Sequence, residues 1–177
     1  MIFIDGSNFY HSSKSSFPDL YRRIDFQKLV ELLRGSRMLV SANYYTALLD
    51  RGVDEKRYWK QQSLLNKLRK IPGFKVVLCK MRKDKDISQS SGFRFVVKGD
   101  DIHIAADMVG DAYENKYDTA ILVSGDGDFV SAIERVQKLG RRVENAYFKN
   151  SGSGQLKAVC NSSILIDRNF IESCLDK

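Results

Sequence analysis

Acidic residues follow several apolar runs of this sequence. Asp5 ends the run IFID, Asp100 and Asp101 follow VVKG, and Asp126 and Asp128 follow ILVSG. Such apolar runs predict buried strands, and the carboxyl ends of parallel strands open onto one crevice. Carboxylates gathered there repel one another unless a cation neutralises them. Mg²⁺ and Mn²⁺ take hard oxygen ligands and keep waters, one of which can act as a nucleophile. The pattern therefore predicts a divalent metal and an anionic substrate.

The acids at the strand ends also have structural interpretations. Asp5 directly follows three apolar residues, where a charge is costly unless it is paired or bound to a cation. The plainer alternative is a turn residue that caps the next helix, and the other acids favour the functional interpretation. The glycines around Asp126 allow a tight turn, so that Asp126 and Asp128 can both face the crevice. Asp128 could cap the following helix while Asp126 points into the site.

The middle of the chain offers further acids, and their helical register decides between them. Asp101 and Asp107 are six positions apart. On a helix they point about 120° apart and lie about 9 Å apart along the axis, so both cannot bind one ion unless the helix starts between them. His103, Asp107 and Asp111 share one face, as ordinary helix-face residues do. We favour Asp101 as a metal ligand and keep Asp107 as its alternative.

The composition fits one globular domain over residues 1–177, with 43% hydrophobic residues. The net charge of +7 favours a polyanionic partner such as nucleic acid, although many unrelated proteins are equally basic. Three cysteines and two histidines without paired spacing argue against structural zinc and fit a reducing compartment. A strand that starts at Met1 leaves no room for a signal peptide, and no apolar run approaches a membrane span. We expect a soluble, cytoplasmic protein.

Strands alternate with helices along the chain, which predicts an α/β fold with a parallel sheet covered on both faces. Residues 12–16 read as a polar loop and residues 80–92 as a mobile loop. Asp25, Asp54 and either Asp100 or Asp101 are expected to cap helices. Residues 150–177 are expected to close the domain. Strands are expected at 2–4, 40–46, 74–79, 93–97, 119–123 and 143–148, and helices after Asp25, Asp54 and Asp101 and over 129–139, 156–159 and 168–175.

Three motifs in this order, FIDGSN, KGDDIHIAADM and LVSGDGDF, resemble the NYN family in its LabA-like branch, within the PIN-like nuclease superfamily. The segment SILID followed by Phe170 and Ile171 resembles the usual family ending, so the likeness covers nearly the whole chain. The resemblance implies a PIN-like, three-layer α/β/α fold with a mainly parallel central sheet. It also implies a ribonuclease centre that depends on Mg²⁺ or Mn²⁺.

The resemblance also implies roles for single residues. Asn8 would orient a carboxylate or a water, and Lys98 and Ser124 would contact phosphate or order the acids. Asp100 stands where the family usually has an apolar residue, and the spacing in classical PIN domains points to Asp107. Asp100, Asp101 and Asp107 are therefore alternatives for the acid that the helix contributes. The implied metal ligands are Asp5, Asp101, Asp126 and Asp128.

Basic residues concentrate in the stretch from Arg51 to Lys85, with Tyr58 and Trp59 among them. Cations can follow a phosphate backbone and aromatic rings can stack on unpaired bases, so single-stranded RNA is the expected ligand. A solvated helix face is the plainer interpretation of such a run. The candidate RNA contacts are Lys56, Arg57, Lys60 and Lys67.

The leading interpretation is a metal-dependent endoribonuclease that hydrolyses RNA phosphodiester bonds at this acidic cluster. The alternative is a non-catalytic RNA- or protein-binding regulatory module of the same fold. A third is a metal-dependent phosphatase or DNA nuclease that uses the same acids. Expected partners are single-stranded RNA and, beyond it, a second copy of the chain or a regulatory protein.

Overall fold

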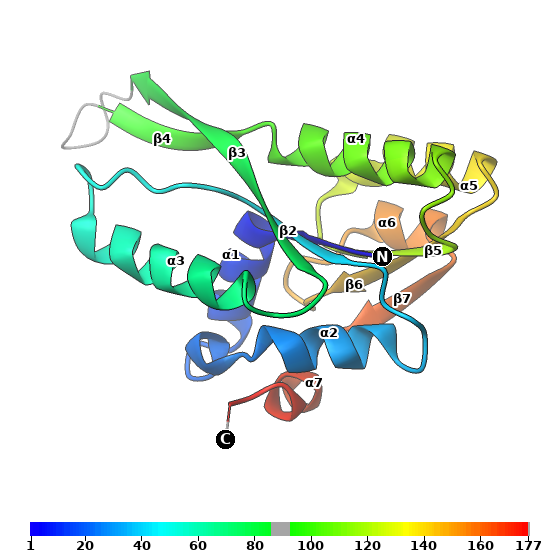
Figure 1. Ribbon diagram of the computed structural model, residues 1–177, viewed down its shortest axis with the longest axis horizontal. Coiled ribbons are helices and arrows are strands. Elements are labelled where there is room, and N and C mark those ends of the chain that lie inside the picture. Colours follow the sequence, from blue (N-terminus) through cyan, green and yellow to red (C-terminus); the bar gives the residue numbers. More distant parts are fainter. Residues whose placement is uncertain (86–92, 177) are drawn as a thin grey trace.

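One mixed sheet forms the centre of the domain. The computed structural model describes the backbone of residues 1–85 and 93–176 and the side chains of residues 1–79 and 99–176. Within these residues the sheet has seven strands in the order β4-β3-β2-β1-β5-β6-β7 (Figure 1). Neighbouring strands are parallel, except that β4 is antiparallel to β3. The strands are β1 (Ile2–Asp5), β2 (Ala42–Ala47), β3 (Phe74–Lys85), β4 (Phe93–Lys98), β5 (Thr119–Val123), β6 (Arg142–Tyr147) and β7 (Ser162–Leu165).

Helices cover both faces of the sheet and bury a separate apolar core on each side. Phe9, Leu29 and Leu65 belong to the core under α1, α2 and α3, which α7 completes. Ile104, Ile133 and Leu156 belong to the core under α4, α5 and α6. The predicted three-layer α/β/α fold with a mainly parallel sheet is confirmed. The helices are α1 (Gly6–Ser16), α2 (Phe26–Arg34), α3 (Glu55–Leu68), α4 (Asp100–Tyr113), α5 (Val130–Lys138), α6 (Gly154–Val159) and α7 (Arg168–Ser173), with 3₁₀ turns η1 (Tyr21–Arg23) and η2 (Gly127–Phe129).

Two sequence predictions about loops are wrong. Residues 12–16 belong to α1, because Ser12 and Ser13 are buried and their hydroxyls donate to Asn8 Oδ1 and to the Tyr10 carbonyl. Residues 80–85 continue β3 and pair with β4. These residues show no alternation of apolar and polar side chains, so the sequence did not predict a strand. Their pairing with β4 makes them one. The rest of the predicted loop, residues 86–92, lies outside the described residues.

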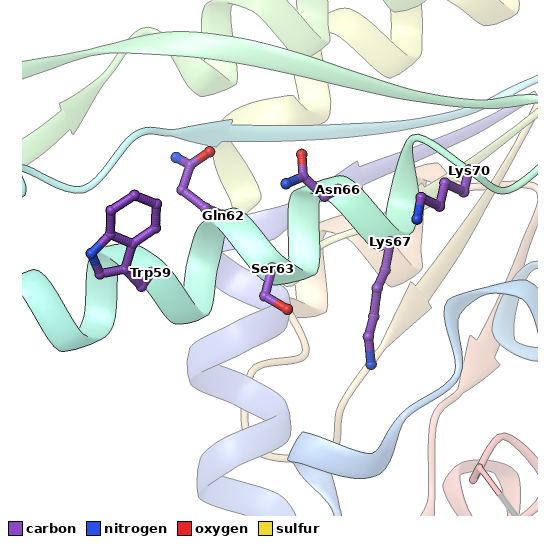
Figure 2. A pocket seen from close by; sticks show the side chains of 6 residues that line it. All are labelled: Trp59, Gln62, Ser63, Asn66, Lys67 and Lys70. Atoms are coloured by element: carbon purple, nitrogen blue, oxygen red, sulfur yellow. The ribbon is translucent and has the colours of Figure 1, made fainter.

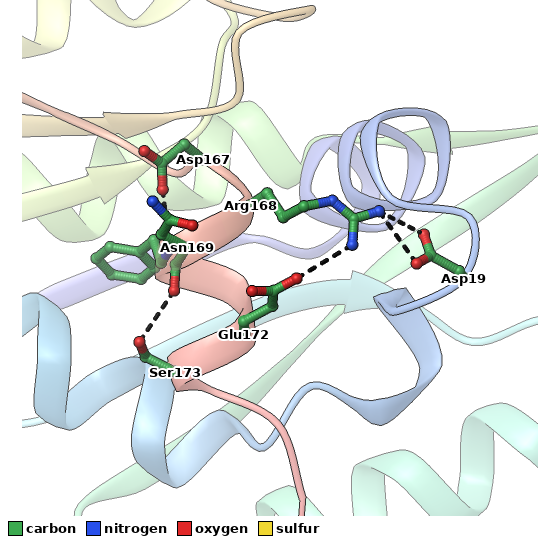
Figure 3. A network of polar contacts seen from close by, with 7 residues as sticks. Asp19, Asp167, Arg168, Asn169, Glu172 and Ser173 are labelled. Atoms are coloured by element: carbon green, nitrogen blue, oxygen red, sulfur yellow. Dashed lines mark hydrogen bonds and ion pairs between the residues drawn. The ribbon is translucent and has the colours of Figure 1, made fainter.

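The C-terminal residues pack against the core that lies under α1, α2 and α3. Ile171 of α7 is fully buried, and the backbone NH of Asp25 donates to the Cys174 carbonyl at 2.7 Å. Arg168 contacts Asp19 at 3.1 Å and Glu172 at 3.2 Å on the surface (Figure 3). Exposed ion pairs contribute little, so apolar burial of α7 provides most of the stability of this packing.

Among the described segments, no helix has the length and apolar character that a bilayer crossing requires.

Candidate active site

Asp5 is the buried centre of the acidic edge. It ends β1 and is only 4% exposed. Its Oδ1 accepts a hydrogen bond from the backbone NH of Asn8 at 2.9 Å, and its Oδ2 accepts one from the Ser124 hydroxyl at 3.0 Å. Asp5 therefore does cap α1, as its structural interpretation proposed. Its Oδ2 is bonded to Ser124, which directly follows β5. Asp5 can therefore cap α1 and also take part in the acidic edge.

The loop after β5 is ordered by a relay of hydrogen bonds. The Ser124 hydroxyl accepts from the backbone NH of Asp126 at 3.1 Å while it donates to Asp5. Asp126 Oδ1 accepts from the backbone NH of Asp128 at 2.9 Å and so caps η2. Asp128 is exposed and caps no helix, since the N-cap of α5 is Phe129. The expectation that Asp128 caps the following helix is wrong, because the 3₁₀ turn between them shifts the start of α5.

Two asparagine side chains fix this loop to its neighbours. Asn8 Oδ1 accepts from the backbone NH of Gly125 at 3.1 Å. Asn145 of β6 is fully buried, and its Nδ2 donates to the carbonyls of Leu122 and Ser124 at 3.2 and 2.8 Å. Sequence reasoning missed Asn145. In the sequence, only the presence of an amide in the largely apolar segment VENAYF sets this residue apart. Its hydrogen-bond partners follow from the pairing of β6 with β5.

Helix α4 brings two more acids to the same edge. Its N-cap is Gly99, in the left-handed region with φ +86°, so neither Asp100 nor Asp101 is the cap that the sequence predicted. Both lie in the first turn, where the helix dipole favours negative charge. Asp100 is buried at 7% exposure, whereas Asp101 is partly exposed. Figure 1 shows that α4 starts above the edge where β1 passes into α1.

Burial and neighbouring acids raise the pKa of Asp5 and of Asp101. Burial raises the pKa of Asp5, and the charges of Asp100 and Asp126 raise it further against the two hydrogen bonds that Asp5 accepts. Burial also raises the pKa of Asp101 to about 6, with Asp100, Asp5, Asp126 and Asp128 adding to the effect. Among ion pairs between side chains that the structure describes, none involves these acids. The edge is a concentration of negative charge.

The donor chemistry of this edge fits Mg²⁺ or Mn²⁺. It offers carboxylate oxygens, and a bound divalent cation would offset the burial and the repulsion that raise the pKa of Asp101. In the described part of the chain, no three His, Cys, Asp or Glu side chains are already placed to hold one ion. Mg²⁺ commonly uses one or two carboxylates and keeps several waters, so it does not require such a preformed group.

Asp107 is engaged elsewhere on α4. Its Oδ2 accepts a hydrogen bond from the Tyr45 hydroxyl of β2 at 2.8 Å, and burial together with this bond raises the pKa of Tyr45. Asp107 is absent from the charges that act on Asp5 and Asp101, whereas Asp100 acts on both. Of the three alternatives in the middle helix, we therefore interpret Asp100 and Asp101 as the acids that accompany Asp5, and Asp107 as the partner of Tyr45 in the sheet.

The charges of these acids also act on the buried thiol of Cys79 on β3. Its pKa rises to about 11, through burial first and then through the charges of Asp100 and Asp107. A thiol held neutral in this way is a poor nucleophile and a poor ligand. Neither Cys79 nor Tyr45 was singled out from the sequence, because both read as ordinary core residues of their strands.

The distinction between the α4 acids can be tested by single isosteric changes. We expect Asp107→Asn to keep at least half of any metal-dependent activity, because Tyr45 can still donate to the amide oxygen. Asp100→Asn and Asp101→Asn are each expected to lower that activity by about 10-fold or more, since each removes a charge beside Asp5. Initial rates at saturating Mn²⁺ measure both. A loss in Asp107→Asn as large as in Asp101→Asn would overturn the assignment.

The four basic residues that the sequence suggested as RNA contacts lie at different places along α3. Lys56, Arg57 and Lys60 are exposed in its first half, which starts beyond the carboxyl ends of the strands, and Arg57 pairs with Asp54 at 4.0 Å. Lys67 is exposed near the other end of the helix, about 16 Å along the axis from Lys56. The structure does not bring it to the acids. The side chain of Lys98 lies outside the described residues.

The fold and the acidic edge together define an α/β domain with a nuclease-like arrangement. The chain matches the NYN domain family over residues 1–167 and belongs to that family. NYN domains are generally nucleases, which supports a hydrolase. A protein of unknown function from Vibrio parahaemolyticus, VPA0982, has a similar crystal structure, with a TM-score of 0.68 and 24% identity over 96% of this chain and 93% of that one. This likeness shows the fold alone. No curated protein matches the chain.

Proposed function

We propose that this NYN domain, of the LabA-like branch, is a metal-dependent endoribonuclease of the cytoplasm that cleaves single-stranded RNA. The observation that carries the proposal is the gathering of Asp5, Asp100, Asp101 and Asp126 at one strand edge, where no basic side chain that the structure describes forms an ion pair with them. A protein gains nothing in stability from such repulsion, so a functional reason is favoured.

Each residue of the edge has a part that its contacts support. Asp5, Asp101 and Asp126, with Asp100 beside them, would hold Mg²⁺ or Mn²⁺, and exposed Asp128 could join them from the loop. When bound, the cation supplies charge stabilisation at the phosphate and a more acidic water. Asn8 and Ser124 act indirectly: they hold Asp5 and the loop at Gly125 in place through the hydrogen bonds described above. They are positioning residues.

The proposal is tested by cleavage of a labelled single-stranded RNA with Mn²⁺. We expect the wild type to cut it within the chain, and Asp126→Asn to lose on the order of 10²–10³ in rate because a charge at the reacting phosphate is lost. Asp118→Asn is the matched control, since Asp118 is almost fully exposed and pairs with Arg141 away from the edge. EDTA should abolish the activity.

Three results would contradict the proposal, each in a different way. Equal cleavage by wild type and Asp126→Asn would place the activity elsewhere or in a contaminant. Binding of the RNA without cleavage by either protein, under all metals tried, would favour the non-catalytic module. Faster turnover of single-stranded DNA or of a phosphomonoester, run in parallel, would favour the DNA nuclease or phosphatase.

A further inference from the structure

The outer face of α3 carries a shallow hollow of about 470 Å³, separate from the acidic edge. Its lining runs along the helix from Trp59 to Lys67, about 12 Å, and continues to Lys70 just past the helix end. Figure 2 shows the side chains projecting from α3 and, for Lys70, from the turn that follows it. The lining residues, of which none is acidic, are Trp59, Gln62, Ser63, Asn66, Lys67 and Lys70.

Trp59 is an aromatic ring held in place at one end of the hollow. The residue is 53% exposed, yet its Nε1 donates to Glu55 at 3.3 Å. The guanidinium of Arg51 lies 5.3 Å from the ring centroid and is itself fixed by an ion pair with Glu55 at 2.6 Å. A large exposed apolar ring that is already positioned loses little entropy when a flat ligand stacks on it.

The remaining lining residues are two lysines, two side-chain amides and Ser63. Lys67 and Lys70 are exposed, and no ion pair between described side chains engages them. Asn66 accepts from Arg69 at 3.2 Å, which leaves its NH₂ group to donate outward, and Gln62 stands one turn before it. A ring for stacking, lysines for phosphate and amides for base edges complement a single polynucleotide strand.

We propose that the α3 hollow is a binding site for single-stranded nucleic acid, with one base stacked on Trp59 and the phosphates beyond it held by Lys67 and Lys70. Helix α3 begins beyond the carboxyl ends of the β-strands and runs back along the domain. This site would therefore hold a flanking segment of the nucleic acid and leave the acidic edge free. The link to cleavage rests on the proposed function, whereas the binding itself does not.

The test uses Trp59 as its own reporter, because it is the single tryptophan of the chain. Wild-type protein in EDTA is titrated with a 12-mer of uridine, with the matching DNA and with polyglutamate of the same charge. We expect saturable quenching by RNA, DNA or both, and none by polyglutamate. Quenching by polyglutamate alone would show an acidic peptide site instead and overturn the proposal, as would no quenching by any probe.

Variants then test the assigned contacts by anisotropy of a labelled strand. Trp59→Ala should weaken binding at least about 5-fold through lost stacking. Lys67→Ala/Lys70→Ala should reduce the slope of log K against log salt by about 1.4, which a merely structural change would not do. Lys138→Ala, an exposed lysine of α5, is the matched control and should change neither. Unchanged affinity and slope in both test variants would overturn the proposal.

The outcomes separate this proposal from the proposed function. Quenching in EDTA that responds to the α3 variants, without any Mn²⁺-dependent cleavage, supports the α3 site and contradicts the proposed nuclease function. Cleavage that depends on Asp126 but not on Trp59, Lys67 or Lys70, with no quenching, contradicts the α3 site and supports the proposed nuclease function.

Discussion

Replacing Asp5 with Asn is expected to lower metal-dependent cleavage by on the order of 10²–10³ while it raises the melting temperature of the metal-free protein at pH 7. The amide keeps the shape of the carboxyl group and can keep both contacts, accepting from the Asn8 NH and donating to the Ser124 hydroxyl. What is lost is a buried charge. The charge is needed for the cation and is unfavourable without it.

The sign of the stability effect follows from the direction of the pKa shifts. Burial and neighbouring acids raise the folded-state pKa of Asp5, and that of Asp101 to about 6, above the usual value of 3.8. A raised pKa in an acid stabilises the fold below the unfolded value, and this contribution is lost as pH rises through the folded value. The metal-free wild type should therefore lose stability between about pH 4 and pH 7.

Melting curves across this pH range, with and without Mn²⁺, measure the effect. For Asp101, which is partly exposed, solvent screening reduces the expected loss to about 1–2 kcal/mol. Mn²⁺ should raise the melting temperature of the wild type at pH 7 and should have little effect on Asp5→Asn. If Asp5→Asn melts below the wild type at pH 7 and still binds Mn²⁺ as well, Asp5 is a structural cap and not part of a metal site.

The sequence predicts the edge itself because its signals are local. An apolar run followed by Asp and Gly marks the end of a buried strand, and parallel topology then gathers the ends of β1 and β5. The approximate limits of these strands and the caps at Asp25 and Asp54 are confirmed for the same reason, since each depends on a few adjacent residues.

The remaining features of the site depend on contacts between distant segments. Whether Asp100 or Asp101 faces inward depends on Gly99, whose left-handed conformation makes it the N-cap, so that α4 begins at Asp100. The role of Asn145 requires β6 to lie beside β5, and the bond from Tyr45 to Asp107 joins residues 62 positions apart. Neither hydrophobic period nor motif spacing contains this information, so sequence reasoning left the α4 acid open.

The tightest of these distant contacts joins the loop after β5 to the segment that follows β6. A Cβ atom on Gly125 would lie 1.6 Å from the backbone oxygen of Ser151, far inside the van der Waals limit. The obstacle is backbone, so no side-chain rotation can relieve it. Gly125 is also the residue whose NH donates to Asn8, between Ser124 and Asp126. The glycine in this motif is thus required by packing as well as by the turn.

Gly125→Ala is accordingly expected to displace the loop, to cost about 2–4 kcal/mol of unfolding free energy and to reduce cleavage at least about 10-fold. Gly154→Ala is the matched control. A Cβ there meets nothing within 4 Å, and the residue begins α6, so alanine should be neutral or slightly stabilising. Urea denaturation gives the free energies, and cleavage at a temperature where both variants are folded separates misplaced acids from simple unfolding. A Gly125→Ala protein with wild-type stability and rate would mean that the two loops move apart freely, and the ordered arrangement of Ser124 and Asp126 would then have no bearing on catalysis.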